Sequence, residues 1–243
     1  MSDSLPPRIS IVVPVYNEAG ACADLAREIA TAFAGTSHEI LFVDDASRDE
    51  TRTILVALKA EIPTLRVIAH GANSGQSRAV RTGVLSASGE IVVTLDGDGQ
   101  NDPADAPRLV ELLSNGPAGL ALVGGERVKR QDTAAKRIAS RLANGIRKRL
   151  LNDQAKDTGC GLKVFHREAF LRLPYFDHIH RYLPALMIRE GYQVAFAPVG
   201  HRPRTTGASK YTNLQRLWAA LSDLTGVMWL NRRARLPGSV AEL

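Results

Sequence analysis

The sequence predicts an α/β fold with a mostly parallel central sheet flanked by helices. Short apolar runs rich in β-branched residues alternate with longer segments that have helical periodicity. This alternation indicates βαβ units. Polar clusters follow the apolar runs, and ligands bind at this carboxyl edge in parallel sheets. The 243 residues suffice for one domain with a sizeable core.

The expected elements follow one another regularly along the chain. We expect strands at residues 9–15, 39–43, 65–69, 90–95, 120–123 and 191–199, and one through Phe165. We expect helices at residues 19–33, 76–87, 104–113, 180–186 and 213–230, and one ending near Glu61. This order predicts a domain over residues 1–212 and a C-terminal amphipathic, basic-ended segment over residues 213–243.

Composition narrows the class of partner. A net charge of +6 and a pI of about 9.6 favour anionic partners, namely phosphates, nucleic acid or an anionic membrane surface. The two cysteines, Cys22 and Cys160, form no disulfide framework, which indicates a reducing compartment. The N-terminus lacks the features of a signal peptide, and no apolar window is long enough to span a bilayer. We therefore expect a protein that is not integral to a membrane but can lie on one.

The chain is organised around Asp96-Gly97-Asp98 and Gln100, which follow an apolar run. Glycines on both sides of Asp98 allow the backbone to turn, so the two carboxylates can converge. Together with the amide oxygen of Gln100 they make an oxygen-only site of the kind that Mg²⁺ or Mn²⁺ prefers. An acidic turn that caps a strand is the alternative interpretation of these residues.

The other polar clusters favour a site over a turn. They fall at the ends of the expected strands, at Tyr16-Asn17-Glu18, Asp44-Asp45 and Asn73-Ser74-Gly75. No G-x-G-x-x-G follows the first strand, which argues against a dinucleotide-binding dehydrogenase, and the chain contains no P-loop sequence. The charge of a phosphate must therefore be met by a metal and by arginines.

A basic segment follows the fifth expected strand. Apolar residues recur in it at helical spacing, so one face can pack while the other is cationic. The cations could hold a phosphate-bearing acceptor or lipid headgroups, or they could form a solvated face. They are Arg127, Lys129, Arg130, Lys136, Arg137, Arg141, Arg147, Lys148 and Arg149.

The C-terminal part contains four weaker signals. Cys160 between two glycines is interpreted as a packing residue rather than a nucleophile, and His178 with His180 is too few residues for a metal site. The polar loop from Arg202 to Tyr211 resembles a lid that closes on phosphates. Both tryptophans lie in the last expected helix, before a basic cluster, which is typical of a helix in a membrane interface. Docking of this helix on the core or on a second copy is the alternative.

Several of these stretches together resemble the inverting GT-A glycosyltransferases of family 2. Asp96 to Gln100 fits that family's D-x-D-x-Q pattern. Within this family, the stretches most resemble the branch that contains dolichol-phosphate mannose synthase and the bacterial undecaprenyl-phosphate glycosyltransferases. The resemblance covers nearly the whole chain. The stretches are 13–18, 43–49, 73–76, 95–100, 157–161, 180–184 and 202–211.

The resemblance assigns roles to residues of this sequence. Asp96, Asp98 and Gln100 would hold Mg²⁺ or Mn²⁺. The acceptor phosphate would be bound by Arg127, Ser140 and either Lys136 or Arg137. Asp96, Asp98 and Arg127 are the residues expected to act in catalysis. The nucleotide sugar would be bound by Pro14, Tyr16, Glu18, Val43, Asp45, Asp96, Gly97, Arg204 and Lys210.

The resemblance also implies the reaction. A hexosyl group would pass, with inversion, from a nucleotide sugar to a polyprenyl monophosphate at the cytoplasmic face of the membrane. GDP-mannose is the favoured donor, with UDP-glucose and other UDP-sugars as alternatives. Many members carry C-terminal membrane spans, so this chain resembles forms that rest on the bilayer or use a separate membrane subunit.

The sequence argues against three other functions. A transferase with a soluble or lipopolysaccharide acceptor is disfavoured by the basic segment and the tryptophans. A non-catalytic nucleotide-sugar-binding subunit has no need of the Asp96, Asp98 and Gln100 ligands. Nucleic-acid binding lacks the interleaved aromatic residues of a single-strand groove, because aromatic residues make up only 5% of the chain.

Overall fold

The fold is described from a computed structural model, over residues 8–128, 145, 149–151, 153, 155, 157–203 and 213–237. Side chains of residues 213–220 are not included. The predicted acceptor residues Lys136, Arg137 and Ser140 and the loop cations Arg204 and Lys210 lie outside these ranges.

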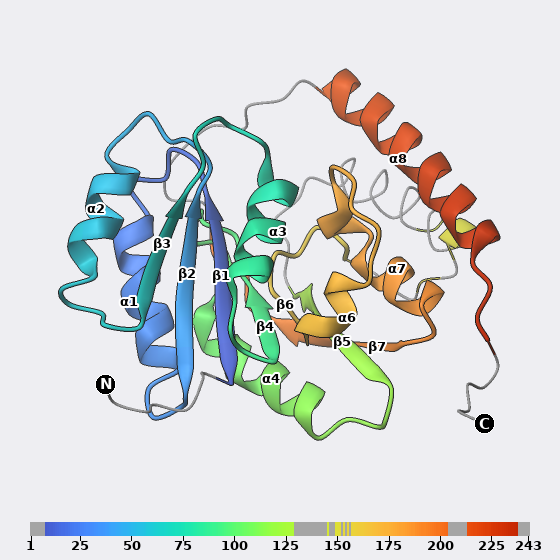
Figure 1. The fold of residues 1–243 in the computed structure, drawn as a ribbon, viewed down its shortest axis with the longest axis horizontal. Coiled ribbons are helices and arrows are strands. Elements are labelled where there is room, and N and C mark those ends of the chain that lie inside the picture. Colours follow the sequence, from blue (N-terminus) through green and yellow to red (C-terminus); the bar gives the residue numbers. More distant parts are fainter. Residues whose placement is uncertain are drawn as a thin grey trace, which may run out of the picture.

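Within the described ranges, seven strands form one sheet in the order β3-β2-β1-β4-β6-β5-β7 (Figure 1). Neighbouring strands are parallel except where β6 pairs with β4 and with β5, so the predicted, mostly parallel α/β sheet is confirmed. The strands are β1 (Ile9–Val15), β2 (His38–Asp44), β3 (Leu65–Ala69), β4 (Ile91–Thr94), β5 (Leu120–Arg127), β6 (Lys163–His166) and β7 (Gln193–Val199).

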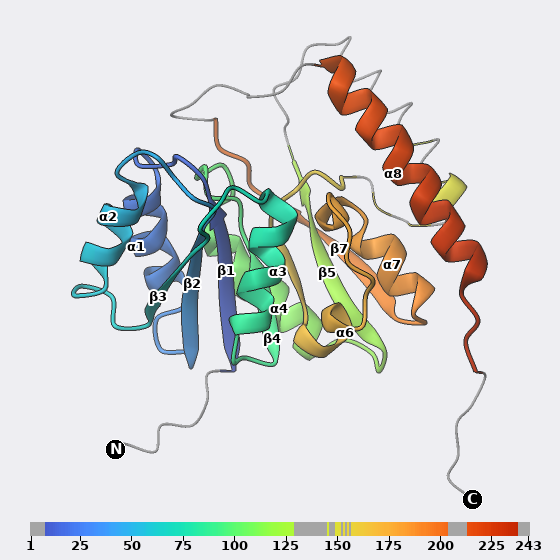
Figure 2. The same cartoon turned by 45° about the horizontal axis from the view of Figure 1, so that its top comes forward.

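The helices cover both faces of the sheet (Figures 1 and 2). On one face lie α1 (Cys22–Ala32), α2 (Thr51–Leu58) and α4 (Ala106–Ser114), the last preceded by the 3₁₀ turn η1 (Pro103–Asp105). On the other lie α3 (Gln76–Ser86), α6 (Arg167–Leu171) and α7 (Leu183–Arg189), with the 3₁₀ turn η2 (Ile179–Arg181) and α8 (Asn213–Arg233). The predicted helix 180–186 is therefore split into η2 and α7.

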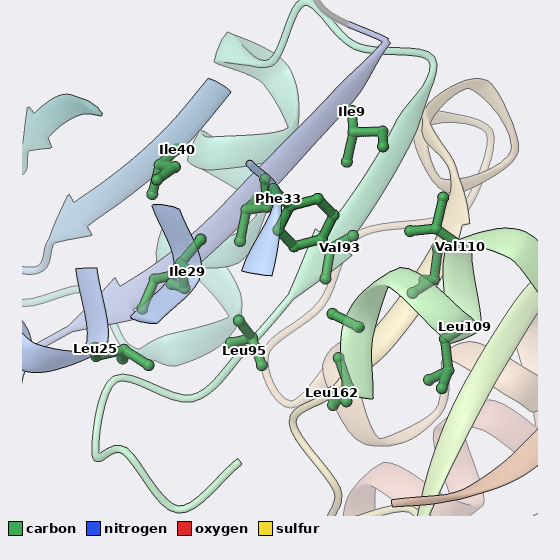
Figure 3. Packing of buried hydrophobic residues seen from close by; sticks show 14 of the residues in the cluster. Ile9, Leu25, Ile29, Phe33, Ile40, Val93, Leu95, Leu109, Val110 and Leu162 are labelled. Atoms are coloured by element: carbon green, nitrogen blue, oxygen red, sulfur yellow. The ribbon is translucent and has the colours of Figure 1, made fainter. Parts of the chain in front are cut away.

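Alternation along the strands gives each face its own apolar core. In β1, Ile11 and Val13 face the helices α1 and α4, where Ile29, Phe33 and Leu109 fill the layer (Figure 3). Val12 of the same strand belongs to the opposite core, with residues of α3, α6 and α7. Strands buried on both faces read as continuous apolar runs, and for that reason the sequence revealed them.

Helix α8 is partly docked on the second core. Val227 is buried there, and the Nδ1 atom of His178 lies 2.8 Å from a carboxylate oxygen of Asp223. The opposite side is open, because the side chains of Leu221 and Trp229 are 47% and 60% exposed. One side of the helix is therefore docked on the core, and the predicted membrane-interface role of its exposed side remains a prediction. In the described part of the chain, no helix is long and apolar enough to cross a bilayer.

Candidate active site

The two carboxylates are carried on a turn that presses against the end of β1. Gly97 has no room for a side chain, because a Cβ atom there would lie 2.7 Å from the Pro14 carbonyl oxygen. The backbone can therefore pass directly over the carboxyl end of β1. Oδ1 of Asp98 accepts a hydrogen bond of 3.2 Å from the Gln100 N–H, which closes the turn.

Asp96 is the more enclosed of the two. Its Oδ1 accepts a hydrogen bond of 2.7 Å from Nε2 of Gln76, at the start of α3. Burial raises the pKa of the Asp96 carboxyl, and the Asp98 carboxylate raises it further, while the positive charges of Lys163 and Arg127 oppose both effects. Two carboxylates are thus held close enough to repel each other.

This arrangement fits a divalent cation. A cation would relieve the repulsion that raises the Asp96 pKa, and carboxylate and amide oxygens are the ligands that Mg²⁺ and Mn²⁺ prefer. The Nε2 atom of Gln100 donates to the Arg202 carbonyl oxygen at 3.4 Å, which leaves the amide oxygen for such a role. Among the described residues no three His, Cys, Asp or Glu side chains cluster as metal ligands, so substrate oxygens would complete the shell. Asp96, Asp98 and Gln100 remain the predicted ligands.

A cavity of about 240 Å³ opens beside Asp96. Its walls come from segments far apart in the sequence, including the end of β1, the start of α3, residues 158–161 and the start of α7. Pro14, Cys160, Lys163, His180 and Arg181 all contribute to it. Sequence reasoning assigned no role here to Lys163 or His180. The signals in the sequence were the stretches 157–161 and 180–184, which resemble the family but gave these two residues no role.

Polar contacts fix this wall. Nδ1 of His180 lies 2.7 Å from the Ser77 hydroxyl, and burial lowers the His180 pKa well below its ordinary value, so the ring is neutral. The side chain of Cys160 is buried, and burial raises the pKa of its thiol, as expected of a packing residue. Gly161 is in contact with Asp96, because a Cβ atom there would lie within 2.5 Å of its carboxyl atoms.

Arg127 lies at the end of β5, which is longer than predicted because it pairs with β7 as far as Val199. Its Nε and a terminal nitrogen donate to the two carboxylate oxygens of Asp157, at 2.6 and 2.8 Å. This bidentate pair is mostly buried and holds the guanidinium in a fixed place. If Arg127 binds a phosphate, it would do so through the N–H groups of its guanidinium that are not donated to Asp157.

The predicted nucleotide residues fall into two groups. Pro14 lines the cavity beside Asp96, whereas Tyr16 lines a second cavity with Arg48, Arg52 and His70, at the ends of β2 and β3. Val43 is fully buried in β2, and Glu18 donates its N–H to the Thr51 hydroxyl at 2.8 Å. The two cavities together extend along the carboxyl edge where ligands bind in such sheets.

Asp45 has a set of protein donors of its own. Its carboxylate accepts hydrogen bonds of 2.8 Å from the N–H groups of Ser74 and Gly75, and Nδ1 of His70 lies 2.7 Å away. The side chain is nearly inaccessible to solvent. These contacts tie the loop before α3 to the end of β2, a structural task that the resemblance did not indicate.

Replacing Asp45 with alanine should lower the free energy of unfolding by about 3 kcal/mol, because three partly buried polar contacts lose their buried carboxylate. Urea unfolding followed by circular dichroism measures the change. Asp24→Ala, at a carboxylate 84% exposed, is the control and should change stability by less than about 0.5 kcal/mol. A loss below 1 kcal/mol for Asp45→Ala would show that the loop is held by other contacts.

The comparisons with known proteins agree with this geometry. The Glycosyl transferase family 2 profile matches residues 10–173. The chain belongs to glycosyl transferase family 2. It is therefore a glycosyltransferase, and the resemblance stated from the sequence is confirmed.

The curated relatives are named as polyprenyl-phosphate sugar transferases. "Dodecaprenyl-phosphate galacturonate synthase" of Rhizobium johnstonii is 31% identical over 95% of this chain and 69% of its own. "Undecaprenyl-phosphate 4-deoxy-4-formamido-L-arabinose transferase" of Sodalis glossinidius is 34% identical over 89% and 66%. The chain thus spans about two thirds of the length of these relatives.

Solved structures confirm the GT-A type of fold. Glucosyl-3-phosphoglycerate synthase from Mycobacterium tuberculosis, in complex with Mn²⁺, UDP-glucose and glycerol 3-phosphate, has a TM-score of 0.67 at 21% identity, covering 96% of this chain and 82% of that one. A mannosyltransferase from Pyrobaculum calidifontis, in complex with GDP-Man and Mn²⁺, has a TM-score of 0.68 at 20% identity, covering 96% and 67%.

Proposed function

We propose that this glycosyltransferase transfers a sugar, with inversion, from a nucleotide sugar to a polyprenyl monophosphate. The observation that carries the proposal is the position of Asp96 at the carboxyl edge of the sheet, where it lines one cavity while Tyr16, just beyond the end of β1, lines a second. One cavity is lined by Tyr16 and arginines and would take the nucleoside, and the other would take the sugar. Asp96, Asp98 and Gln100 would hold Mg²⁺ or Mn²⁺ at the diphosphate.

The acceptor proposal rests on charge and on the relatives. The chain has a net charge of +6, and its basic segment begins at Arg127, at the same edge as the carboxylates. The two relatives described above are named for dodecaprenyl phosphate and undecaprenyl phosphate. Arg127, Ser140 and Lys136 or Arg137 are therefore proposed to bind the acceptor phosphate. Arg204 and Lys210 are proposed to bind the phosphates of the donor.

The donor is proposed to be a UDP-sugar rather than GDP-mannose. Neither curated relative is named for mannose, since their sugars are galacturonate and 4-deoxy-4-formamido-L-arabinose. GDP-mannose, which the sequence resemblance favoured, is kept as the second donor because a mannosyltransferase shares the fold.

The mechanism needs positioning more than proton transfer. A phosphate monoester has a second pKa near 6, so the acceptor is already mostly dianionic at neutral pH and needs no strong base. The protein's task is to orient the acceptor phosphate and the anomeric carbon and to exclude water. Gln76 and Gly161 hold the Asp96 carboxylate in place for this. The bound cation would supply a Lewis acid that neutralises charge on the departing nucleoside diphosphate.

The proposed location is the cytoplasmic face of the membrane, where α8 would lie on the bilayer with or without a separate membrane subunit. Trp229 is exposed on α8, and three arginines, Arg232, Arg233 and Arg235, follow it. Tryptophan beside cations is typical of helices in an anionic interface.

Replacing Trp218 and Trp229 with serine should weaken binding to anionic vesicles at least about tenfold, because each indole buries apolar surface in the interface. Flotation with vesicles that contain an anionic lipid measures this. Val56→Ser, at an exposed residue of α2 on the opposite side of the molecule (Figure 1), is the control and should float like the parent protein. If the double variant floats as well as the parent protein, α8 serves only to dock on the core and does not bind the membrane.

A donor screen tests the proposed reaction most directly. The full chain is incubated with Mn²⁺, undecaprenyl phosphate and each of several UDP- and GDP-sugars, and the released nucleoside diphosphate is measured. We expect release that requires the lipid phosphate and is fastest with one UDP-sugar. Release of nucleoside diphosphate with a soluble acceptor but not with the lipid would overturn the acceptor assignment. Release with GDP-mannose as the only active donor would overturn the assignment of a UDP-sugar.

A further inference from the structure

Lys163 is a buried cation that the mechanism above does not use. It is the first residue of β6 and pairs with Thr94, the last residue of β4, directly before the carboxylate turn. Residues opposite each other in an antiparallel pair lie on the same face of the sheet, and both side chains line the cavity beside Asp96. Lys163 is only 4% exposed.

In the described part of the chain, Lys163 forms no ion pair. Its Nζ donates to the Cys160 carbonyl oxygen, and the carboxylates of Asp96 and Asp157 attract its charge only from beyond ion-pair distance. An ammonium group has three N–H donors, so two are left over. Burying an unpaired charge is costly, and proteins bury such groups mainly where a ligand or a metal supplies the missing partner.

The cavity around Lys163 is short of negative charge. Among its lining residues Asp96 has the only carboxylate, and that group is the proposed metal ligand. Arg181 adds a second cation to the lining, while the His180 ring is held by Ser77. A divalent cation at Asp96 would make the surroundings more positive still. An anion that enters the cavity would supply the partner that the described lining residues do not.

We propose that Lys163 binds a phosphate oxygen of a substrate inside this cavity. The inference rests on the proposed function, because both substrates of that reaction carry phosphate. The phosphate is either the donor diphosphate, held at Asp96, or the acceptor monophosphate at the far side of the sugar. In both cases Lys163 stabilises negative charge near the reacting centre, and an ammonium group binds phosphate as a point charge.

A lysine with only a structural task is the competing explanation. Its hydrogen bond to Cys160 would then hold the turn 160–163 beside Asp96, and its loss would destabilise the fold. The two explanations predict opposite signs for stability. Removing an unpaired buried charge stabilises the protein or leaves it unchanged, whereas removing a structural hydrogen bond destabilises it.

The test uses the full chain with Lys163→Met, which keeps the length of the side chain and removes its charge. Lys59→Met, at an exposed lysine beyond α2, is the matched control. Calorimetric titration with UDP and with GDP in the presence of Mn²⁺ measures donor-side binding. Steady-state kinetics with undecaprenyl phosphate measures the acceptor side, and thermal unfolding measures stability.

We expect an unchanged or higher melting temperature for Lys163→Met and a roughly 10- to 100-fold loss on one of the two sides. Weaker binding of UDP or GDP assigns Lys163 to the donor diphosphate. Unchanged nucleotide binding with a raised KM for undecaprenyl phosphate assigns it to the acceptor. Binding and kinetics within twofold of the parent protein would overturn the proposal, as would a loss of function that follows a lowered melting temperature.

The titration also separates this inference from the proposed function. Suppose that the parent protein transfers no sugar to any lipid phosphate, but that Lys163→Met binds nucleotide more weakly than the parent protein does. The acceptor assignment then fails, and the phosphate role of Lys163 stands. If the parent protein transfers sugar to the lipid phosphate and Lys163→Met behaves like Lys59→Met, the proposed function stands and the phosphate role of Lys163 fails.

Discussion

Replacing Asp98 with alanine should lower kcat/KM by about a thousandfold while the fold stays intact. Asp96 and Asp98 are the two carboxylates of the turn. A metal ion held by them is expected to contribute several kcal/mol to transition-state stabilisation. Asp98 accepts a hydrogen bond of 3.2 Å from the Gln100 N–H within the turn, and it lies outside both apolar cores, so the cores should be unaffected. Release of nucleoside diphosphate with Mn²⁺ and lipid phosphate measures the loss.

Two controls accompany this variant. Asp24→Ala removes an exposed carboxylate from α1 and should leave the rate unchanged. Treating the parent protein with a chelator should reproduce the defect, and added Mn²⁺ should reverse it in the parent protein but not in Asp98→Ala. Turnover of Asp98→Ala near that of the parent protein would remove Asp98 from the metal site.

Gly161→Ala is expected to have the second-largest effect, a loss of about a hundredfold in kcat. The added methyl group would lie within 2.5 Å of the carboxyl atoms of Asp96. Those atoms are the end of a side chain, so Asp96 should rotate away while the backbone stays in place. A misplacement of about 1 Å at a catalytic group costs about a hundredfold in rate. Stability should fall by no more than about 1 to 3 kcal/mol, as for other overpacked sites.

The matched control is Gly226→Ala in α8, where a Cβ atom would meet nothing within 4 Å. It should stabilise the protein by up to about 1 kcal/mol, because alanine favours a helix more than glycine does. Its activity should equal that of the parent protein. Full activity in Gly161→Ala would mean that Asp96 can move without harm, which would contradict its assigned role.

The order of the elements in the first half of the fold could be predicted from the sequence, although α1 begins three residues later than predicted and α2 ends three residues earlier. The strands β1 and β3 have the predicted bounds, and α3 ends one residue earlier than expected. These elements are local βαβ units whose apolar runs are buried on both faces. The position of β6 could not be predicted, because its antiparallel pairing with β4 and β5 joins segments that lie far apart in the chain.

The site could be predicted only in part, for the same reason. Asp96, Asp98 and Gln100 lie within five residues of one another, so a local pattern reveals them. Lys163 and His180 enter the site through strand pairing and helix packing, which a local pattern does not encode. Asp45 is the opposite case: a local pattern placed it in the site, but its carboxylate accepts hydrogen bonds from the Ser74 and Gly75 N–H groups of the protein's own loop.

The ion pair between Arg127 and Asp157 has a consequence for how this enzyme could change its acceptor. The two residues are 30 positions apart, so their bidentate contact closes a loop that contains most of the basic segment. The cost of closing a loop grows only slowly with its length, by about 0.6 kcal/mol for each doubling. The sequence between these two residues can therefore be lengthened or exchanged at little thermodynamic cost. Under the proposed function, the acceptor-binding part of the chain could therefore be exchanged while the donor-binding part is kept.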